Sequence, residues 1–179
     1  MKRRDYLTAA LLGAVLCLLG PFSLPMGPIP LSLATLGVYL AAGLLGPRRG
    51  CAAVGLYLLL GALGLPVFAG FAGGIQRLLG PTGGFLLGYL LCALLSGWLV
   101  ARCKQPWGVP LALGVSTLAL YAVGTLWFSL QTQGSVGAAL LLCVVPFLVG
   151  DGVKIAVATA VILPLRKKIR RLEERRHTD

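Results

Sequence analysis

Long runs of apolar residues alternate along the chain with short segments rich in glycine, proline or charge, such as "GPRRG" and "QTQGS". The apolar runs cover residues 6–22, 30–46, 50–66, 83–102, 108–128 and 138–165. Runs of about 20 apolar residues without strand-like alternation are typical of helices that cross a membrane. The pattern therefore predicts an all-α membrane protein in which residues 1–179 form a single domain with six transmembrane helices.

The sixth apolar run is too long for one straight span. Its 28 residues would make a helix of about 42 Å, whereas the hydrocarbon core of a bilayer is about 30 Å thick. Pro146, Gly150 and Gly152 predict a break near residues 146–150. We therefore expect the last span over residues 150–165, beginning near Asp151 and followed by a basic tail over residues 166–179.

Composition and charge support a membrane protein and predict its orientation. The chain is 58% hydrophobic and 12% charged, whereas soluble domains carry about 25% charged residues. Its net charge of +11 comes from basic clusters at residues 2–4, 48–49, 102–104 and 166–176, each beside an apolar run. Such clusters mark the cytoplasmic ends of membrane spans. We therefore expect both termini on the cytoplasmic side of the cell membrane. We expect no nucleic-acid partner.

One carboxylate and one ammonium group interrupt the last apolar run, in "PFLVGDGVKIAVATAV". Asp151 and Lys154 are three residues apart, so they share a face of a helix. Ionisable residues inside a membrane are functional candidates, because an isolated charge in hydrocarbon is costly. Two structural alternatives stay open: a salt bridge that only locks the helix, or a snorkelling Lys154 with Asp151 as helix N-cap.

The segment between the third and fourth runs is the second candidate, because it is long, rich in glycine and still apolar. Phe68 and Phe71 offer apolar contact, Gly73 permits close approach, and Gln76 and Arg77 are polar. A surface charge is an equal alternative for Arg77. The uncharged first loop ends in Ser32 and Thr35, which could line a cavity; capping of the second helix is the simpler role for Ser32.

Catalytic and metal-binding patterns are missing from the apolar runs. The single histidine, His177, lies in the basic tail, and no glutamate lies in any run. No nucleophile–base set or metal-ligand cluster can be assembled there, and no phosphate-binding loop is present. The sequence therefore predicts a protein that is not an enzyme, holds no cofactor, and draws any energy for transport from a gradient or another subunit.

Several of these stretches together resemble one protein family. "LGLPVFAG", "GPTGGFLLG" and the P-F-x-x-G-D-x-x-K arrangement at residues 146–154 are similar to BioY, the biotin-binding S component of energy-coupling-factor transporters. The resemblance covers about residues 5–168. It implies a six-helix protein of the bacterial cell membrane that captures biotin from outside. It also implies a membrane T component and two cytoplasmic ATPase subunits as partners.

The resemblance also implies residue roles. The implied biotin-contacting residues are Asp151, Lys154, Arg77, Gln76, Phe68, Phe71, Gly73, Thr35 and Tyr39. Ala10 and Ala14 match the small-residue motif by which S components contact the T component. The chain departs from the family at Ala34, where a glutamine is usual, so that polar contact is absent or supplied by another residue such as Gln76. Biotin's two ureido N–H groups suit a carboxylate such as Asp151.

Three other functions stay open at this point. The chain could be an S component for another vitamin, such as thiamine or riboflavin. It could carry biotin alone, without an ATPase, or it could be a structural membrane subunit without a ligand. Competition between vitamins, uptake by the chain alone and thermal stabilisation by vitamins distinguish these possibilities.

Overall fold

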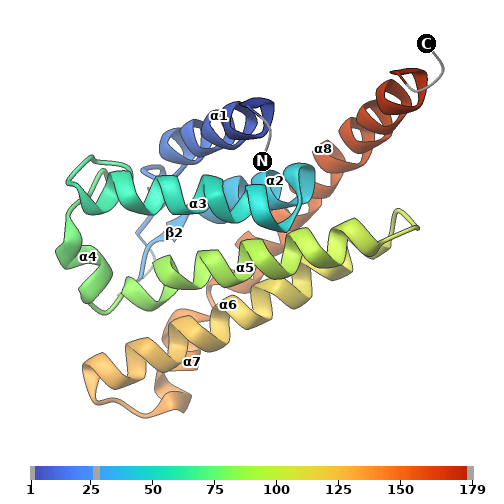
Figure 1. The fold of residues 1–179 in the computed structure, drawn as a ribbon. Coiled ribbons are helices and arrows are strands. Elements are labelled where there is room, and N and C mark those ends of the chain that lie inside the picture. Colours follow the sequence, from blue (N-terminus) through green and yellow to red (C-terminus); the bar gives the residue numbers. More distant parts are fainter. Residues whose placement is uncertain (1–2, 26–28, 177–179) are drawn as a thin grey trace.

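The computed structural model describes residues 3–25 and 29–176, and helices dominate these residues (Figure 1). The elements in chain order are α1 (Arg3–Leu19), β1 (Ser23–Leu24), β2 (Leu31–Ser32), α2 (Ala34–Leu45), α3 (Pro47–Ala62), α4 (Ile75–Leu79), α5 (Gly83–Arg102), α6 (Gly108–Thr132), α7 (Val136–Cys143) and α8 (Phe147–Arg176). The mainly helical class predicted from the sequence is confirmed. The position of His177 lies outside the described residues.

A small antiparallel hairpin replaces the predicted start of the second helix. Ser23 pairs with Ser32 and Leu24 with Leu31, so α2 begins at Ala34 rather than at residue 30. Ser32 stabilises this arrangement, because its hydroxyl donates to the Gly20 carbonyl at 2.8 Å and accepts the Ala34 N–H at 3.0 Å. The expectation of helices alone was therefore wrong at this point. Ser32 nevertheless accepts a backbone N–H at the start of α2, as a capping residue does.

The last apolar run is broken earlier than predicted. Residues 144–146 form a turn between α7 and α8, and α8 begins at Phe147 directly after Pro146, which is tolerated at a helix start. Asp151 therefore lies in the second turn of α8, so neither the expected helix start near Asp151 nor its N-cap alternative is correct. The helix also continues beyond residue 165 to Arg176, because Arg, Lys, Leu and Glu are good helix formers.

Helix α2 occupies the middle of the bundle and packs against α1, α3, α5 and α8, while α5 and α6 form an extended antiparallel pair (Figure 1). Gly43 of α2 leaves room for a side chain of α8. A Cβ atom at this position would lie 2.5 Å from Cδ1 of the fully buried Ile162. Close backbone approach at small residues is typical of helices packed in membranes.

The basic clusters lie at one end of the bundle. Arg49 at the start of α3 forms a 2.7 Å ion pair with Asp5 of α1. A Cβ atom at Gly97, near the end of α5, would meet the backbone of Pro47. Arg166 of α8 donates to the Val100 carbonyl of α5 at 2.6 Å. This one-sided arrangement agrees with the orientation predicted from charge.

Three of the described helical segments are long and apolar enough to cross a bilayer: Gly83–Arg102, Gly108–Thr132 and Phe147–Lys168. Shorter apolar helices cover Asp5–Leu19 and Ala34–Leu45. These segments support a multi-pass membrane protein. The count of six spans and the cytoplasmic position of both termini stay predictions.

Candidate functional site

A cavity of about 50 Å³ lies at the end of the bundle opposite the basic clusters. The hairpin contributes Ser32 to its wall, and the connection between α3 and α5 contributes Phe68 and Arg77. Other wall residues come from the helices: Tyr57 of α3, and Phe85, Leu86 and Tyr89 of α5. The wall is thus aromatic and apolar with a few polar groups, as in sites for small organic molecules.

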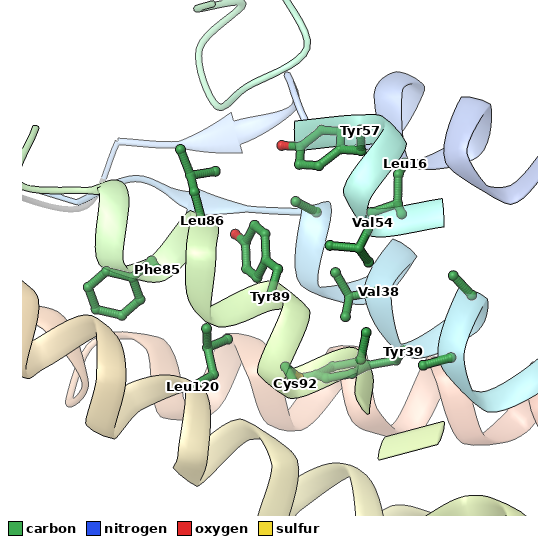
Figure 2. Close-up of a cluster of buried hydrophobic side chains, with 14 of the residues drawn as sticks. Leu16, Val38, Tyr39, Val54, Tyr57, Phe85, Leu86, Tyr89, Cys92 and Leu120 are labelled. Atoms are coloured by element: carbon green, nitrogen blue, oxygen red, sulfur yellow. The ribbon is translucent and has the colours of Figure 1, made fainter. Parts of the chain in front are cut away.

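Two tyrosines bring hydroxyl groups to this apolar wall. Figure 2 shows Tyr57 and Tyr89 on different helices, with both hydroxyls on the side of the core where the hairpin runs. Tyr57 is fully buried, and among the described residues its hydroxyl has no hydrogen-bond partner. A buried polar group without a partner costs about 1–3 kcal/mol, so Tyr57 is a candidate to bind a ligand.

Phe68 closes the cavity by packing against α3. Its ring meets that of Tyr57 edge to face, with centroids 5.4 Å apart. The ring occupies the space beside Gly61, where an added Cβ atom would lie 2.1 Å from Cζ of Phe68. The lack of a side chain at Gly61 therefore determines the position of the Phe68 ring in the cavity wall.

We expect Gly61→Ala to displace Phe68 and to lower the free energy of unfolding by about 1–3 kcal/mol, the usual cost of overpacking. Gly55→Ala is the matched control, because Gly55 lies on the same helix and a Cβ atom there meets nothing within 4 Å. The control should be neutral or up to about 1 kcal/mol more stable. Denaturant titration in mixed micelles measures both variants. Equal stability of the two would contradict the packing assigned to Phe68.

A buried ion pair lies behind the hairpin. Nζ of Lys154 is 2.8 Å from Oδ1 of Asp151, and both residues are almost fully buried. The ammonium group also donates to the Ser32 carbonyl at 2.6 Å and to the Thr35 hydroxyl at 3.0 Å. The Tyr121 hydroxyl of α6 donates to Oδ2 of Asp151 at 2.5 Å. The pair thus connects α8 with α2, α6 and the hairpin.

This cluster is nearly saturated with hydrogen bonds. A lysine ammonium group has three donors, and three acceptors surround it: Asp151, Ser32 and Thr35. Asp151 receives bonds from Lys154, Thr35 and Tyr121, which leaves about one of its four lone-pair sites. Ser32 links the two parts of the site, because its carbonyl binds Lys154 and the same residue lines the cavity.

The structure separates the predicted site residues into three groups. Phe68 and Arg77 lie on the cavity wall, while Asp151, Lys154 and Thr35 form the polar cluster behind Ser32. The predicted salt bridge is present. The snorkelling alternative is wrong, because the side chain of Lys154 is buried rather than extended to a surface.

Four predicted residues line neither the cavity nor the ion pair: Tyr39, Phe71, Gly73 and Gln76. The buried Tyr39 hydroxyl pairs with Thr117 at 2.6 Å. Phe71 is exposed and contacts the ring of Phe22 edge to face. Gln76 is also exposed and donates to the Gly73 carbonyl, and its predicted role in place of the contact missing at Ala34 stays a prediction.

Sequence reasoning missed Tyr57, Tyr89 and Tyr121, which the structure brings to the cavity or to Asp151. A signal was present, because all five tyrosines lie within the apolar runs, where a hydroxyl needs a partner. Ala10 and Ala14 are exposed along α1, and their predicted contact with a T component stays a prediction. Within residues 3–25 and 29–176, no group of three His, Cys, Asp or Glu side chains could hold a metal.

Comparison with known proteins identifies the family of the chain. The model of the BioY family matches residues 1–171. The chain is 39% identical to the biotin transporter BioY of Thermotoga maritima, over 92% of this chain and 96% of that protein. It is 38% identical to a probable biotin transporter BioY of Pyrococcus horikoshii, over 93% and 97% of the two chains.

A solved structure is similar as well. The crystal structure of the S-component for biotin from an ECF-type ABC transporter matches with a TM-score of 0.85 and 28% identity. The match covers 93% of this chain and 95% of the other. These relatives are transporter components, in agreement with the prediction that the chain is not an enzyme. The chain belongs to the BioY family.

Proposed function

We propose that this chain captures biotin as the S component of an energy-coupling-factor transporter. The observation that carries the proposal is the buried Asp151–Lys154 pair, hydrogen-bonded to a residue of the cavity wall, in a chain of the BioY family. The relatives named biotin transporters support the substrate. A membrane T component and two ATPase subunits are the proposed partners, and the cytoplasmic membrane of a bacterium is the proposed location.

The ion pair is complementary to a ureido group. A ureido group presents N–H donors beside a carbonyl acceptor, and the pair offers a carboxylate acceptor beside an ammonium donor 2.8 Å away. Charge-assisted hydrogen bonds of this kind are about twice as strong as neutral ones. In the proposed complex Asp151 accepts one ureido N–H bond and Lys154 donates to the ureido oxygen.

The cavity must widen before biotin can enter. Its volume of about 50 Å³ is far below the range of about 300–1,000 Å³ found for ligand sites. The 2.6 Å bond from Lys154 to the Ser32 carbonyl holds the hairpin against the ion pair. In the proposed mechanism this bond breaks as the hairpin moves outward, and the ureido oxygen replaces the Ser32 carbonyl on Lys154.

The remaining parts of biotin fit the rest of the wall. Phe68, Phe85 and Leu86 supply apolar surface for the ring and the aliphatic chain. Arg77 is exposed at the cavity and suits the carboxylate of the tail. Ala10 and Ala14 form an exposed small-residue surface on α1, which is the proposed contact with the T component.

Tyr57→Phe tests whether the cavity takes part in binding. We expect an affinity for biotin about 5- to 10-fold lower, the equivalent of one hydrogen bond, without loss of stability because the hydroxyl has no partner in the described protein. Tyr39→Phe is the matched control: its hydroxyl pairs with Thr117, so stability should fall by about 1 kcal/mol while binding is kept. If Tyr39→Phe loses biotin binding and Tyr57→Phe keeps it, Tyr39 rather than Tyr57 contacts biotin.

Competition binding tests the proposed substrate directly. Labelled biotin is equilibrated with the purified protein in detergent, and unlabelled biotin, thiamine or riboflavin is added. Displacement by biotin alone is expected. Binding of thiamine or riboflavin in preference to biotin would overturn the proposed substrate, and absence of any vitamin binding by folded protein would favour a structural subunit.

A further inference from the structure

A second hollow lies at the turn between α5 and α6, on the end of the bundle that carries the basic clusters. It has a volume of about 450 Å³, and its wall includes Leu99, Arg102, Lys104, Trp107, Leu111 and Val115. We name this hollow the turn groove. Arg102 lies 16 residues after Leu86, so along α5 the turn groove is about 24 Å from the first cavity. It is therefore separate from the site for biotin.

Two cations, Arg102 and Lys104, lie at the turn groove. The guanidinium group of Arg102 stacks on the Trp98 ring, with Cζ 3.5 Å from the ring centroid. This cation–π contact orients Arg102. Lys104 follows in the turn and is exposed. Trp107 also lines the groove and is exposed. Tryptophan is enriched where a membrane meets water.

The groove continues into an apolar track along α6. Leu111 and Val115 form part of its wall, and Leu118 follows three residues later on the same face of the helix. All three are exposed in the bundle. A molecule that fills the groove therefore meets cations and tryptophan at one end and an exposed apolar helix face at the other.

We propose that the turn groove binds one anionic phospholipid, with the phosphate between Arg102 and Lys104 and an acyl chain along Leu111 and Val115. Charge complementarity selects an anionic head group, since the groove carries two cations and no carboxylate among its lining residues. Basic pockets between membrane helices are known to take such head groups. A free phosphate would use the cations alone, whereas the apolar track fits only a molecule with a long hydrocarbon chain.

Lipid retention tests this site. The purified protein is exchanged into micelles containing equal amounts of phosphatidylglycerol and phosphatidylcholine, and the bound lipid is identified by native mass spectrometry. We expect one phosphatidylglycerol per chain, preferred about 30-fold over phosphatidylcholine, from two cations near the surface. Equal retention of the two lipids would overturn the proposal and leave the groove to an apolar partner helix.

Arg102→Gln/Lys104→Gln should abolish the preference for phosphatidylglycerol. Lys167→Gln/Lys168→Gln is the matched control: it removes the same charge from exposed positions on α8, outside the groove. Loss of the preference in both variants would show a general effect of surface charge and contradict a defined site. Val115→Trp should fill the apolar track and lower lipid retention. If glycerol phosphate competes as strongly as the lipid does, the groove binds a free anion and the proposal is wrong.

Discussion

Asp151→Asn is expected to lower the affinity for biotin by about 100-fold. The asparagine keeps the volume of the side chain but loses its charge, and hydrogen bonds to a charged group contribute about 1.5–3 kcal/mol each. In the proposed complex one ureido N–H bond depends on that carboxylate. Equilibrium binding of labelled biotin to the purified variant measures the effect.

Asp5→Asn is the matched control, because Asp5 forms its ion pair with Arg49 at the opposite end of the bundle. Its affinity for biotin should equal that of the unmodified protein. Thermal unfolding of the Asp151→Asn protein in detergent establishes that it is folded before binding is compared. If a folded Asp151→Asn protein binds biotin as the unmodified protein does, Asp151 has only a structural role.

Lys154→Met is expected to lower the free energy of unfolding by about 3–5 kcal/mol, the usual cost of leaving one partner of a buried ion pair without the other. The change also frees the Ser32 carbonyl and removes a donor from Thr35. The double variant Asp151→Asn/Lys154→Met should recover most of this stability, because no uncompensated charge stays buried. It should still bind biotin as weakly as Asp151→Asn. Denaturant titration in mixed micelles measures each protein.

Lys168→Met controls for the loss of a lysine as such, because Lys168 is exposed on α8. Its stability should be unchanged. A double variant that is no more stable than Lys154→Met would show that the charges of the pair do not determine its stability. If the double variant recovers both stability and biotin binding, the Asp151–Lys154 pair does not take part in biotin recognition.

Much of the helical framework could be predicted from the sequence, because apolar runs and their breakers are local signals. The predicted run 83–102 agrees with the observed α5, and the break in the last run is displaced by only a few residues. The hairpin was missed because its two-residue strands are too short for a periodic pattern. Its position depends on Ser32, whose partners Gly20 and Lys154 are distant in the chain.

The candidate site was predictable in part, for a similar reason. Asp151 and Lys154 stand out in an apolar run, so their pairing could be inferred from spacing alone. Their burial against Ser32, Thr35 and Tyr121 could not, because those contacts join α8 to the hairpin and to two other helices. Phe71 and Gln76 are exposed, which residue type alone could not tell, and their predicted contact with biotin stays a prediction.

A crystal structure of the protein with biotin bound is the most direct test of the central claim, that the Asp151–Lys154 pair receives the ureido group. The account predicts one ureido nitrogen atom about 2.7–2.9 Å from a carboxylate oxygen of Asp151. It also predicts that Lys154 has left the Ser32 carbonyl, which it contacts at 2.6 Å here. Biotin bound elsewhere, or bound with the Lys154–Ser32 bond unchanged, would contradict the account.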